Sequence, residues 1–188
     1  TGRLELEFEK LYERLLLPSM RHSTGGARKR YAGLVRGPRG PEVEFVGMEV
    51  VRRDWTDLAR SVQRELYRRL FLDEPVEAFL QDVVLGVRGG RFDEQLVYRK
   101  ALRKELEDYT ATTPPHVAAA RKSGTDVRGL VAYVVTVAGP EPAEGRESPI
   151  DREHYVQKQV RPVAEPVLAA LGLDFDRVIG DDRQGRLF

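Results

Sequence analysis

Cysteine is absent from the chain, and this absence excludes disulfide bonds, thiol catalysis and metal sites built on cysteine. The histidines are few and far apart, at His22, His116 and His154, without the spacing of a metal site. We therefore expect each to be an ordinary surface or packing residue. The longest apolar run, Leu130 to Ala138, is too short to cross a bilayer, so no membrane partner is expected.

The chain also lacks a secretory leader and an initial methionine. It begins inside a patterned segment, where Leu4, Leu6 and Phe8 alternate with glutamates. We expect it to be the C-terminal piece of a larger, cytoplasmic protein, for which the lack of cysteine is suitable. An apolar content of 41% and a charged content of 32% are typical of a globular chain that buries a core.

Acidic residues are missing between Glu13 and Glu42, although the whole chain has a net charge of only +1. The basic residues of this window are Arg14, Arg21, Arg28, Lys29, Arg30, Arg36 and Arg39. Tyr31 adjoins the densest part. Guanidinium and ammonium groups beside a planar ring suit a polyanion that carries sugars and bases, which indicates nucleic acid. The alternative is a basic loop that only faces solvent.

Periodicity predicts an α+β fold. The alternation at 4–8 indicates a strand, another is expected around 15–20, and the segments 31–35 and 43–46 are expected to pair across a turn at 36–41. Helices are expected over 56–71 and 76–87, with short helices or turns around 98–109 and 117–122. We then expect a buried strand at 130–137, a loop at 139–142 and a long helix from Ser148 to about Leu171. Pro162 and Pro166 should kink or split that helix.

Several short motifs occur in collinear order. They are Leu-Glu-Leu-Glu-Phe-Glu-Lys at 4–10, Lys-Arg-Tyr-Ala-Gly at 29–33, Gly-Met-Glu-Val-Val-Arg-Arg-Asp-Trp at 47–55, Val-Tyr-Arg-Lys at 97–100, Pro-Pro-His-Val at 114–117 and Ser-Pro-Ile-Asp-Arg-Glu-His-Tyr at 148–155. In this order they resemble the end of the palm and the thumb of family B DNA polymerases, in particular the bacterial polymerase II group. The resemblance implies a palm-derived antiparallel sheet at 1–50, a mainly helical thumb at 51–173 and a tail at 174–188.

The resemblance implies that the chain holds primer–template duplex in the bacterial nucleoid. Lys29 and Tyr31 match the Lys-Xaa-Tyr pattern of the family, which lies near the primer end. The other residues expected at the DNA are Arg28, Arg30, Arg52, Arg53, Arg99, Lys100, His116 and Arg121. A stripe on the first helix, Arg60, Arg64 and Arg68, binds either phosphate or only solvent. Glu7 is a possible accessory carboxylate, with an exposed strand position as the alternative.

The metal-holding aspartates of the family lie in two palm motifs, and neither is present in this sequence. We therefore expect the chain to have no cofactor or metal of its own and no polymerase activity; Mg²⁺ belongs to the full-length enzyme. The pair in Asp174-Phe175-Asp176 is interpreted as solvated.

The last residues, Gln184, Leu187 and Phe188, resemble the sliding-clamp peptide of bacterial polymerases, so the clamp is an expected partner. The rival hypothesis is a free-standing nucleic-acid-binding or protein-interaction domain related to the thumb. An upstream in-frame palm would decide between the two.

Overall fold

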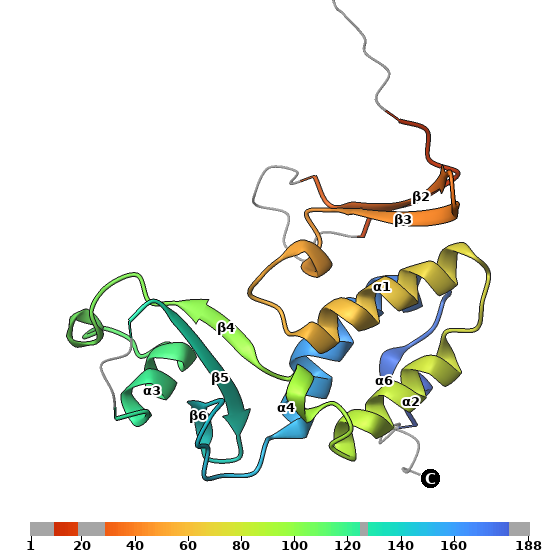
Figure 1. Ribbon diagram of the computed structural model, residues 1–188. Helices are drawn as coiled ribbons and strands as arrows, with labels where there is room; N and C mark the ends of the chain where they lie inside the picture. The colour runs from red at the N-terminus through yellow and green to blue at the C-terminus, as the bar shows by residue number, and fades with distance from the viewer. Residues whose placement is uncertain (1–9, 19–28, 125–127, 181–188) are drawn as a thin grey trace, which may run out of the picture.

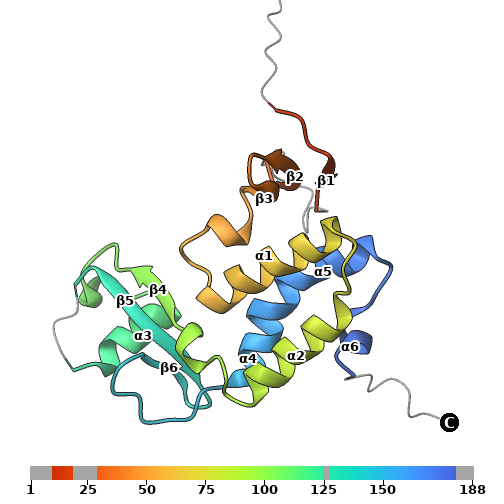
Figure 2. The same cartoon turned by 45° about the vertical axis from the view of Figure 1, so that its right-hand side comes forward.

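The computed structural model describes residues 10–18, 29–124 and 128–180. Within these residues the chain has the predicted α+β fold, with two three-stranded antiparallel sheets and a helical body. Sheet A, the strands β1–β3, lies above helix α1, and sheet B, the strands β4–β6, lies beside the helical body, at the left of the view (Figures 1 and 2). The predicted strand at 4–8 falls outside the described residues.

Sheet A contains β1 (Arg14–Leu16), β2 (Tyr31–Gly37) and β3 (Gly40–Val46), in the order β1-β2-β3. The predicted pairing of 31–35 with 43–46 is confirmed, and Leu34 lies opposite Val43. The turn predicted over 36–41 is shorter than expected. Only two residues separate Gly37 from Gly40, whose φ of +117° suits glycine, so the strands continue almost to the tip.

The helical body is built from α1 (Asp57–Phe71), α2 (Glu77–Arg88) and a C-terminal group of helices. Both were predicted from their apolar periodicity. Thr56 caps α1 by accepting a hydrogen bond from the Ala59 N–H at 3.2 Å. The C-terminal group comprises α4 (Arg152–Tyr155), the π-helical segment η4 (Val156–Val160), α5 (Arg161–Ala170) and α6 (Phe175–Val178).

The last long helix starts later than predicted. Asp151, not Ser148, is its N-cap and accepts from the His154 N–H at 3.0 Å. The Ser148 N–H is held instead by the Glu141 carboxylate at 3.1 Å, and Ile150 forms a β-bridge with Thr136. These strand-like contacts keep 148–150 extended, so a local capping signal lost to tertiary pairing.

The predicted interruption of this helix occurs as the π-helical segment η4, just before Pro162. Proline has no N–H to give to the carbonyl four residues earlier, which belongs to Lys158. The Gln159 side-chain amide donates to that carbonyl at 3.0 Å. The freed acceptor is therefore satisfied inside the helix.

Sheet B contains β4 (Tyr98–Ala101), β5 (Leu130–Thr136) and β6 (Gly139–Pro142), in the order β4-β5-β6. Only β5 was predicted. The expectations of a helix or turn at 98–101 and of a loop at 139–142 were wrong. Helix α3 (Pro115–Lys122) packs against β5 and β6, and the short 3-10 turns are η1 (Glu49–Val51), η2 (Asp93–Gln95) and η3 (Leu106–Asp108).

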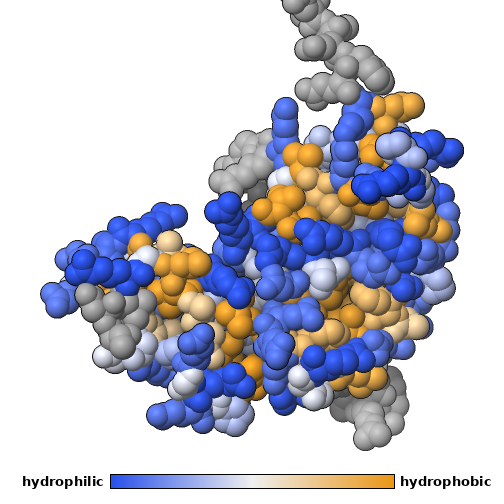
Figure 3. Space-filling model, in the orientation of Figure 1, coloured by the Kyte–Doolittle hydropathy of each residue, from blue (hydrophilic) through white to orange (hydrophobic). Residues whose placement is uncertain are grey.

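One continuous apolar core joins both sheets to the helical body. It includes Leu34 from sheet A, Leu66 and Val84 from the helices, and Tyr133 from sheet B. Hydrophilic side chains cover much of the face along α1, and the hydrophobic ones there form separate small patches (Figure 3). No helix in the described part of the chain is long and apolar enough to span a membrane.

Candidate nucleic-acid interface

The Lys-Xaa-Tyr segment leads into β2, and its three residues differ in exposure and in ion pairing. Lys29 is exposed and forms no ion pair with any described residue. Arg30 is half-buried, and its guanidinium forms an ion pair with the carboxylate of Glu49 on η1. Tyr31 is half-buried, with its ring edge-to-face to Tyr12 at 5.8 Å between centroids. Only Lys29 of these three presents an unpaired charge to solvent.

Tyr12 supports Tyr31 and was missed by sequence reasoning. Its ring lies over Gly33, where a Cβ atom would meet the Tyr12 ring at 2.2 Å, so the glycine of this motif makes room for the ring. The hydrogen bond with Tyr31, burial and the charge of Glu44 raise the pKa of Tyr12 to about 12. Tyr12 therefore stays neutral at physiological pH. The glycine after Tyr-Ala was the only signal for this contact.

The adjacent arginines Arg52 and Arg53 follow η1 and differ in whether they form an ion pair. Arg52 forms a bidentate ion pair with Asp54, at 3.0 and 2.6 Å. Burial works to raise the pKa of Asp54, but the hydrogen bond and charge of Arg52, together with the charge of Lys100, outweigh it and lower that pKa. Arg53 is exposed and has no ion-pair partner among the described residues.

The structure brings Arg99 and Lys100 next to these arginines. Arg99 on β4 lies 3.5 Å from a carboxylate oxygen of Asp57, at the start of α1. Lys100 is exposed, and its charge acts on Asp54 as well as on His116. Residues more than 40 positions apart in the sequence thus share one edge of the molecule, where β4 passes the start of α1 (Figure 1).

His116 and Arg121 both lie on α3, where the first is buried and the second is hydrogen-bonded to the preceding segment. His116 is only 4% exposed and packs edge-to-face with Tyr109 at 6.3 Å. Burial, with the nearby charge of Lys100, lowers the pKa of His116, so the ring is neutral near pH 7. The Arg121 guanidinium donates to the carbonyls of Leu106 and Tyr109, each at 3.0 Å, and so holds the segment before α3.

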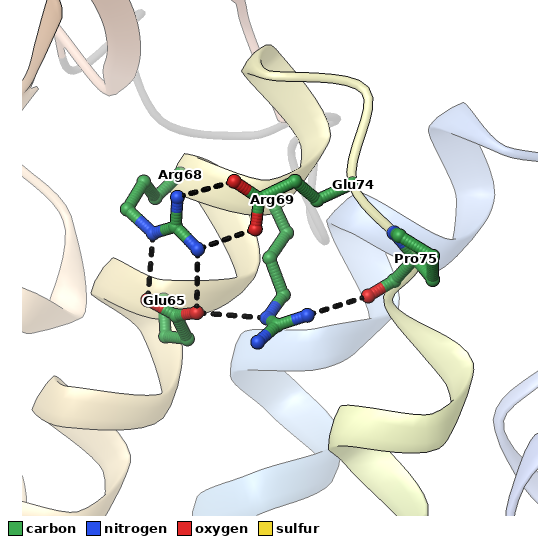
Figure 4. A network of polar contacts seen from close by, with 5 residues as sticks. All are labelled: Glu65, Arg68, Arg69, Glu74 and Pro75. Atoms are coloured by element: carbon green, nitrogen blue, oxygen red, sulfur yellow. Dashed lines mark hydrogen bonds and ion pairs between the residues drawn. The ribbon is translucent and has the colours of Figure 1, made fainter.

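The arginine stripe of α1 is largely neutralised by acidic neighbours (Figure 4). Arg68 donates to Glu65 at 2.9 Å and to Glu74, beyond the end of α1, at 2.6 Å. Arg69 donates to the same Glu65 at 2.8 Å. Arg60 is paired with Asp57. Arg64 is exposed and is the member of the stripe without an ion pair to a described residue.

The motif at 148–155 joins sheet B to the helical body. Arg152 forms a bidentate ion pair with Asp93, at 3.0 and 2.8 Å, and His154 Nε2 shares a hydrogen bond with the Tyr98 hydroxyl at 3.0 Å. Tyr98 stacks between Tyr133 and Tyr155, with centroids 5.2 and 5.4 Å away. Burial raises the pKa of Tyr98 and Tyr155 and lowers that of His154. This motif is therefore a structural joint.

No group of three or more acidic or histidine side chains is close enough to hold a metal ion in the described ranges 10–18, 29–124 and 128–180. Asp174 caps α6 by accepting from the Arg177 N–H at 3.0 Å, and Asp176 is paired with Arg161. This pair of carboxylates is thus engaged in structure. The remaining predicted site residues, Glu7, Arg28, Gln184, Leu187 and Phe188, lie outside the described residues.

Comparison with known proteins agrees with the motifs. The family model described as DNA polymerase family B matches residues 1–171. DNA polymerase II of Escherichia coli (strain K12) is 42% identical over 179 residues, which are 89% of this chain and 23% of that protein. DNA polymerase 2 of Aeropyrum pernix is 31% identical, over 97% of this chain and 23% of that protein.

A solved structure supports the same assignment. The family B DNA polymerase from the hyperthermophilic archaeon Pyrobaculum calidifontis matches with a TM-score of 0.64 and 30% identity, over 87% of this chain and 22% of that one. The chain therefore belongs to DNA polymerase family B. Within that family it resembles the polymerase II of bacteria, as predicted, and it spans less than a quarter of the length of these relatives.

Proposed function

We propose that this chain is the palm end and thumb of a polymerase II-like enzyme, and that it holds primer–template duplex without sequence preference. Residues 1–50 form the strip of palm, 51–173 the thumb and 174–188 the tail. Support for this division comes from the change in architecture around η1, which lies between the end of sheet A and the start of α1. Family membership supplies the substrate class, which is DNA.

One observation carries the proposal: many basic side chains of the described ranges are ion-paired within the fold, while several exposed ones at the predicted interface are not. Those without an ion pair to a described residue include Lys29, Arg53, Arg64 and Lys100. Two sets of contacts connect the surroundings of these cations. Arg30 is linked through Glu49 to α1, and Asp54 and Asp57 lie near basic residues of β4. An unpaired exposed cation gains a partner at a phosphate without first breaking an internal ion pair.

The parent enzyme transfers nucleotides with Mg²⁺, as the family does, but the chain itself is not the catalytic part. Phosphoryl transfer needs carboxylates that hold two metal ions, and the aspartates of the family's two palm motifs are missing from this sequence. Incubation of the purified chain with primed template, Mg²⁺ and nucleotides should give no incorporation. Incorporation that persists through rigorous purification would overturn this assignment.

Salt titration tests the duplex-holding role. Binding of the chain to two unrelated duplexes should have nearly equal affinity, with a log–log salt slope of about three to five, since each phosphate contact contributes about 0.9. The triple variant Lys29→Ala/Arg53→Ala/Lys100→Ala should lower the slope by about 2.7. Arg91→Ala is the matched control, because Arg91 is exposed but paired with Asp82 at 2.6 Å. A flat salt response, or a strong preference for one duplex, contradicts the proposal.

We also propose that the tail binds the sliding clamp through Gln184, Leu187 and Phe188, on the strength of the sequence alone. Removal of 184–188 takes away two apolar anchors but only one basic residue, Arg186. Clamp binding should be lost and duplex binding kept, with processivity reduced in the full enzyme because tethering raises the effective concentration of the polymerase at DNA. Unchanged clamp binding would assign the two apolar residues to packing.

A further inference from the structure

We propose that Arg30, Glu49 and Gln63 form a positioning relay that fixes Lys29 and Tyr31 against helix α1. Arg30 is then not itself a DNA contact. This inference rests on the proposed function, because it concerns how the duplex-holding Lys29 is presented. It adds a role for two residues, Glu49 and Gln63, that have no positive charge to offer a phosphate.

The relay is continuous from β2 to α1. The Arg30 guanidinium is ion-paired with one carboxylate oxygen of Glu49, and the other oxygen accepts from the Gln63 amide at 2.9 Å. The Gln63 carbonyl oxygen in turn accepts from the Val50 N–H at 2.7 Å. Both Glu49 oxygens and both ends of the Gln63 amide are therefore engaged, and the η1 turn is tied to the hairpin and to the helix.

Burial makes this geometry rigid. Gln63 is fully buried, and the Glu49 side chain is 10% exposed against 35% for Arg30. The partners of this buried carboxylate are therefore costly to lose, because an unpaired buried charge destabilises the fold. The relay therefore has one favoured arrangement.

The backbone contact at Gly47 passes this rigidity to Lys29. Gly47 has a φ of +63°, and a Cβ atom there would meet the Lys29 carbonyl oxygen at 2.2 Å. The Lys29 peptide thus rests directly on the turn that Glu49 holds. The flexible Lys29 side chain therefore starts from a fixed backbone position. Lys29 and Tyr31 are the two sequence neighbours of Arg30, so the anchoring of Arg30 fixes both.

A charge argument separates positioning from simple electrostatics. Glu49→Gln removes a negative charge near the polyanion and frees Arg30, so duplex binding should become tighter if only electrostatics matters. Duplex binding should become weaker if positioning matters, because Lys29 would no longer be held at its contact. The direction of the change is thus informative before its size is measured.

A double-mutant cycle in the full-length polymerase that contains this chain tests the relay. Duplex affinity is measured for the parent, Lys29→Ala, Glu49→Gln and the double variant. We expect Lys29→Ala to weaken binding about tenfold, and Glu49→Gln to weaken it about fivefold when Lys29 is present but less than twofold when it is absent. Arg30→Lys, which keeps the charge but replaces the planar guanidinium by a shorter ammonium group, should weaken binding two- to threefold, roughly between parent and Glu49→Gln.

Thermal unfolding of each variant controls for loss of fold, and Arg30→Lys provides the test if Glu49→Gln does not fold. Tighter binding by Glu49→Gln, or an equal effect with and without Lys29, overturns the relay and leaves the duplex-holding role intact. Normal binding by Lys29→Ala overturns the relay and removes Lys29 from the duplex contact, while the salt titration still tests the duplex-holding role by itself. Non-additive weakening with an unchanged fold supports the relay.

Discussion

The two sheets are attached to the same helical body by different chemistry. Sheet A is held through the polar relay of Arg30, Glu49 and Gln63, beside an edge-to-face contact of Phe45 with Tyr67 at 5.5 Å. Sheet B is held mainly by the stack of Tyr98, Tyr133 and Tyr155, with hydrogen bonds between Tyr98 and His154 and from the Val135 N–H to Tyr155. A polar attachment has one geometry and is intolerant of substitution, whereas stacked rings supply mainly buried area. The precise attachment is at the sheet that carries Lys29.

The largest expected effect comes from breaking the aromatic attachment. Tyr155 is fully buried, stacks on Tyr98 and accepts a hydrogen bond from the Val135 N–H at 2.7 Å. Tyr155→Ala should lower the free energy of unfolding by about 3–5 kcal/mol, because it empties a large site in the core. Denaturant titration followed by circular dichroism measures this. A loss below 1 kcal/mol would show that sheet B is held elsewhere.

Removal of one hydroxyl from each attachment should give effects of opposite sign. The Tyr67 hydroxyl is buried without a hydrogen-bond partner in the described part of the chain, whereas the Tyr155 hydroxyl has one. Tyr67→Phe should raise the free energy of unfolding by about 1 kcal/mol, since an unsatisfied buried hydroxyl is costly, and Tyr155→Phe should lower it by about 1 kcal/mol. Equal signs in the same denaturation assay would contradict this difference between the attachments.

Helix α1, between the sheets, offers a matched pair of arginines. Arg64 is exposed and unpaired among the described residues, while Arg68 is held by Glu65 and Glu74. Arg64→Ala should weaken duplex binding about two- to fivefold and lower the salt slope by about 0.9. Arg68→Ala should leave binding nearly unchanged and cost about 0.5 kcal/mol of stability. Equal binding losses would mean that DNA competes successfully with the internal ion pairs.

The smallest effect is expected in acid, within sheet B. Glu141 accepts from the N–H groups of Glu147 and Ser148, at 2.9 and 3.1 Å, and from Thr136 Oγ1 at 3.2 Å. Hydrogen bonding from Ser148 first, then from these other groups, lowers the pKa of Glu141 from 4.5 to about 2. Its contribution is full above pH 4.5 and is lost as pH falls toward 2. Glu141→Gln should flatten unfolding profiles over that window; an unchanged acid slope contradicts this.

The elements that were predictable are those in which local pattern and tertiary packing agree. The periodicity of α1 and α2 and the β2–β3 hairpin are of this kind. Strand β4 was not predictable, because Tyr98 alone of its residues is buried and its partner strand lies some 30 residues away. Strand β6, Gly-Pro-Glu-Pro, contains two prolines and is tolerated because it lies at the edge of its sheet.

The residue types of the candidate interface could be read from the sequence, but which of its cations are ion-paired could not. Sequence reasoning placed Lys29 and Arg30 together, while the structure separates an exposed cation from one that is paired with Glu49. That pairing depends on the η1 turn, and the pairing of Arg68 with Glu74 depends on the turn after α1. Which cation is free is decided by tertiary structure, which charge counting does not contain.

The buried Gln159 side chain links two parts of the helical body that are made at different times during synthesis. Its carbonyl oxygen accepts from the N–H and the hydroxyl of Thr56, the residue that caps α1, at 3.1 and 2.9 Å. The two residues are 103 positions apart. During synthesis, when residues emerge in order at about 5–20 per second, this anchor for the start of α1 arrives roughly 5–20 seconds after Thr56 itself. The contact that anchors the start of the helix beneath sheet A can therefore form only after residues 57–159 have been made.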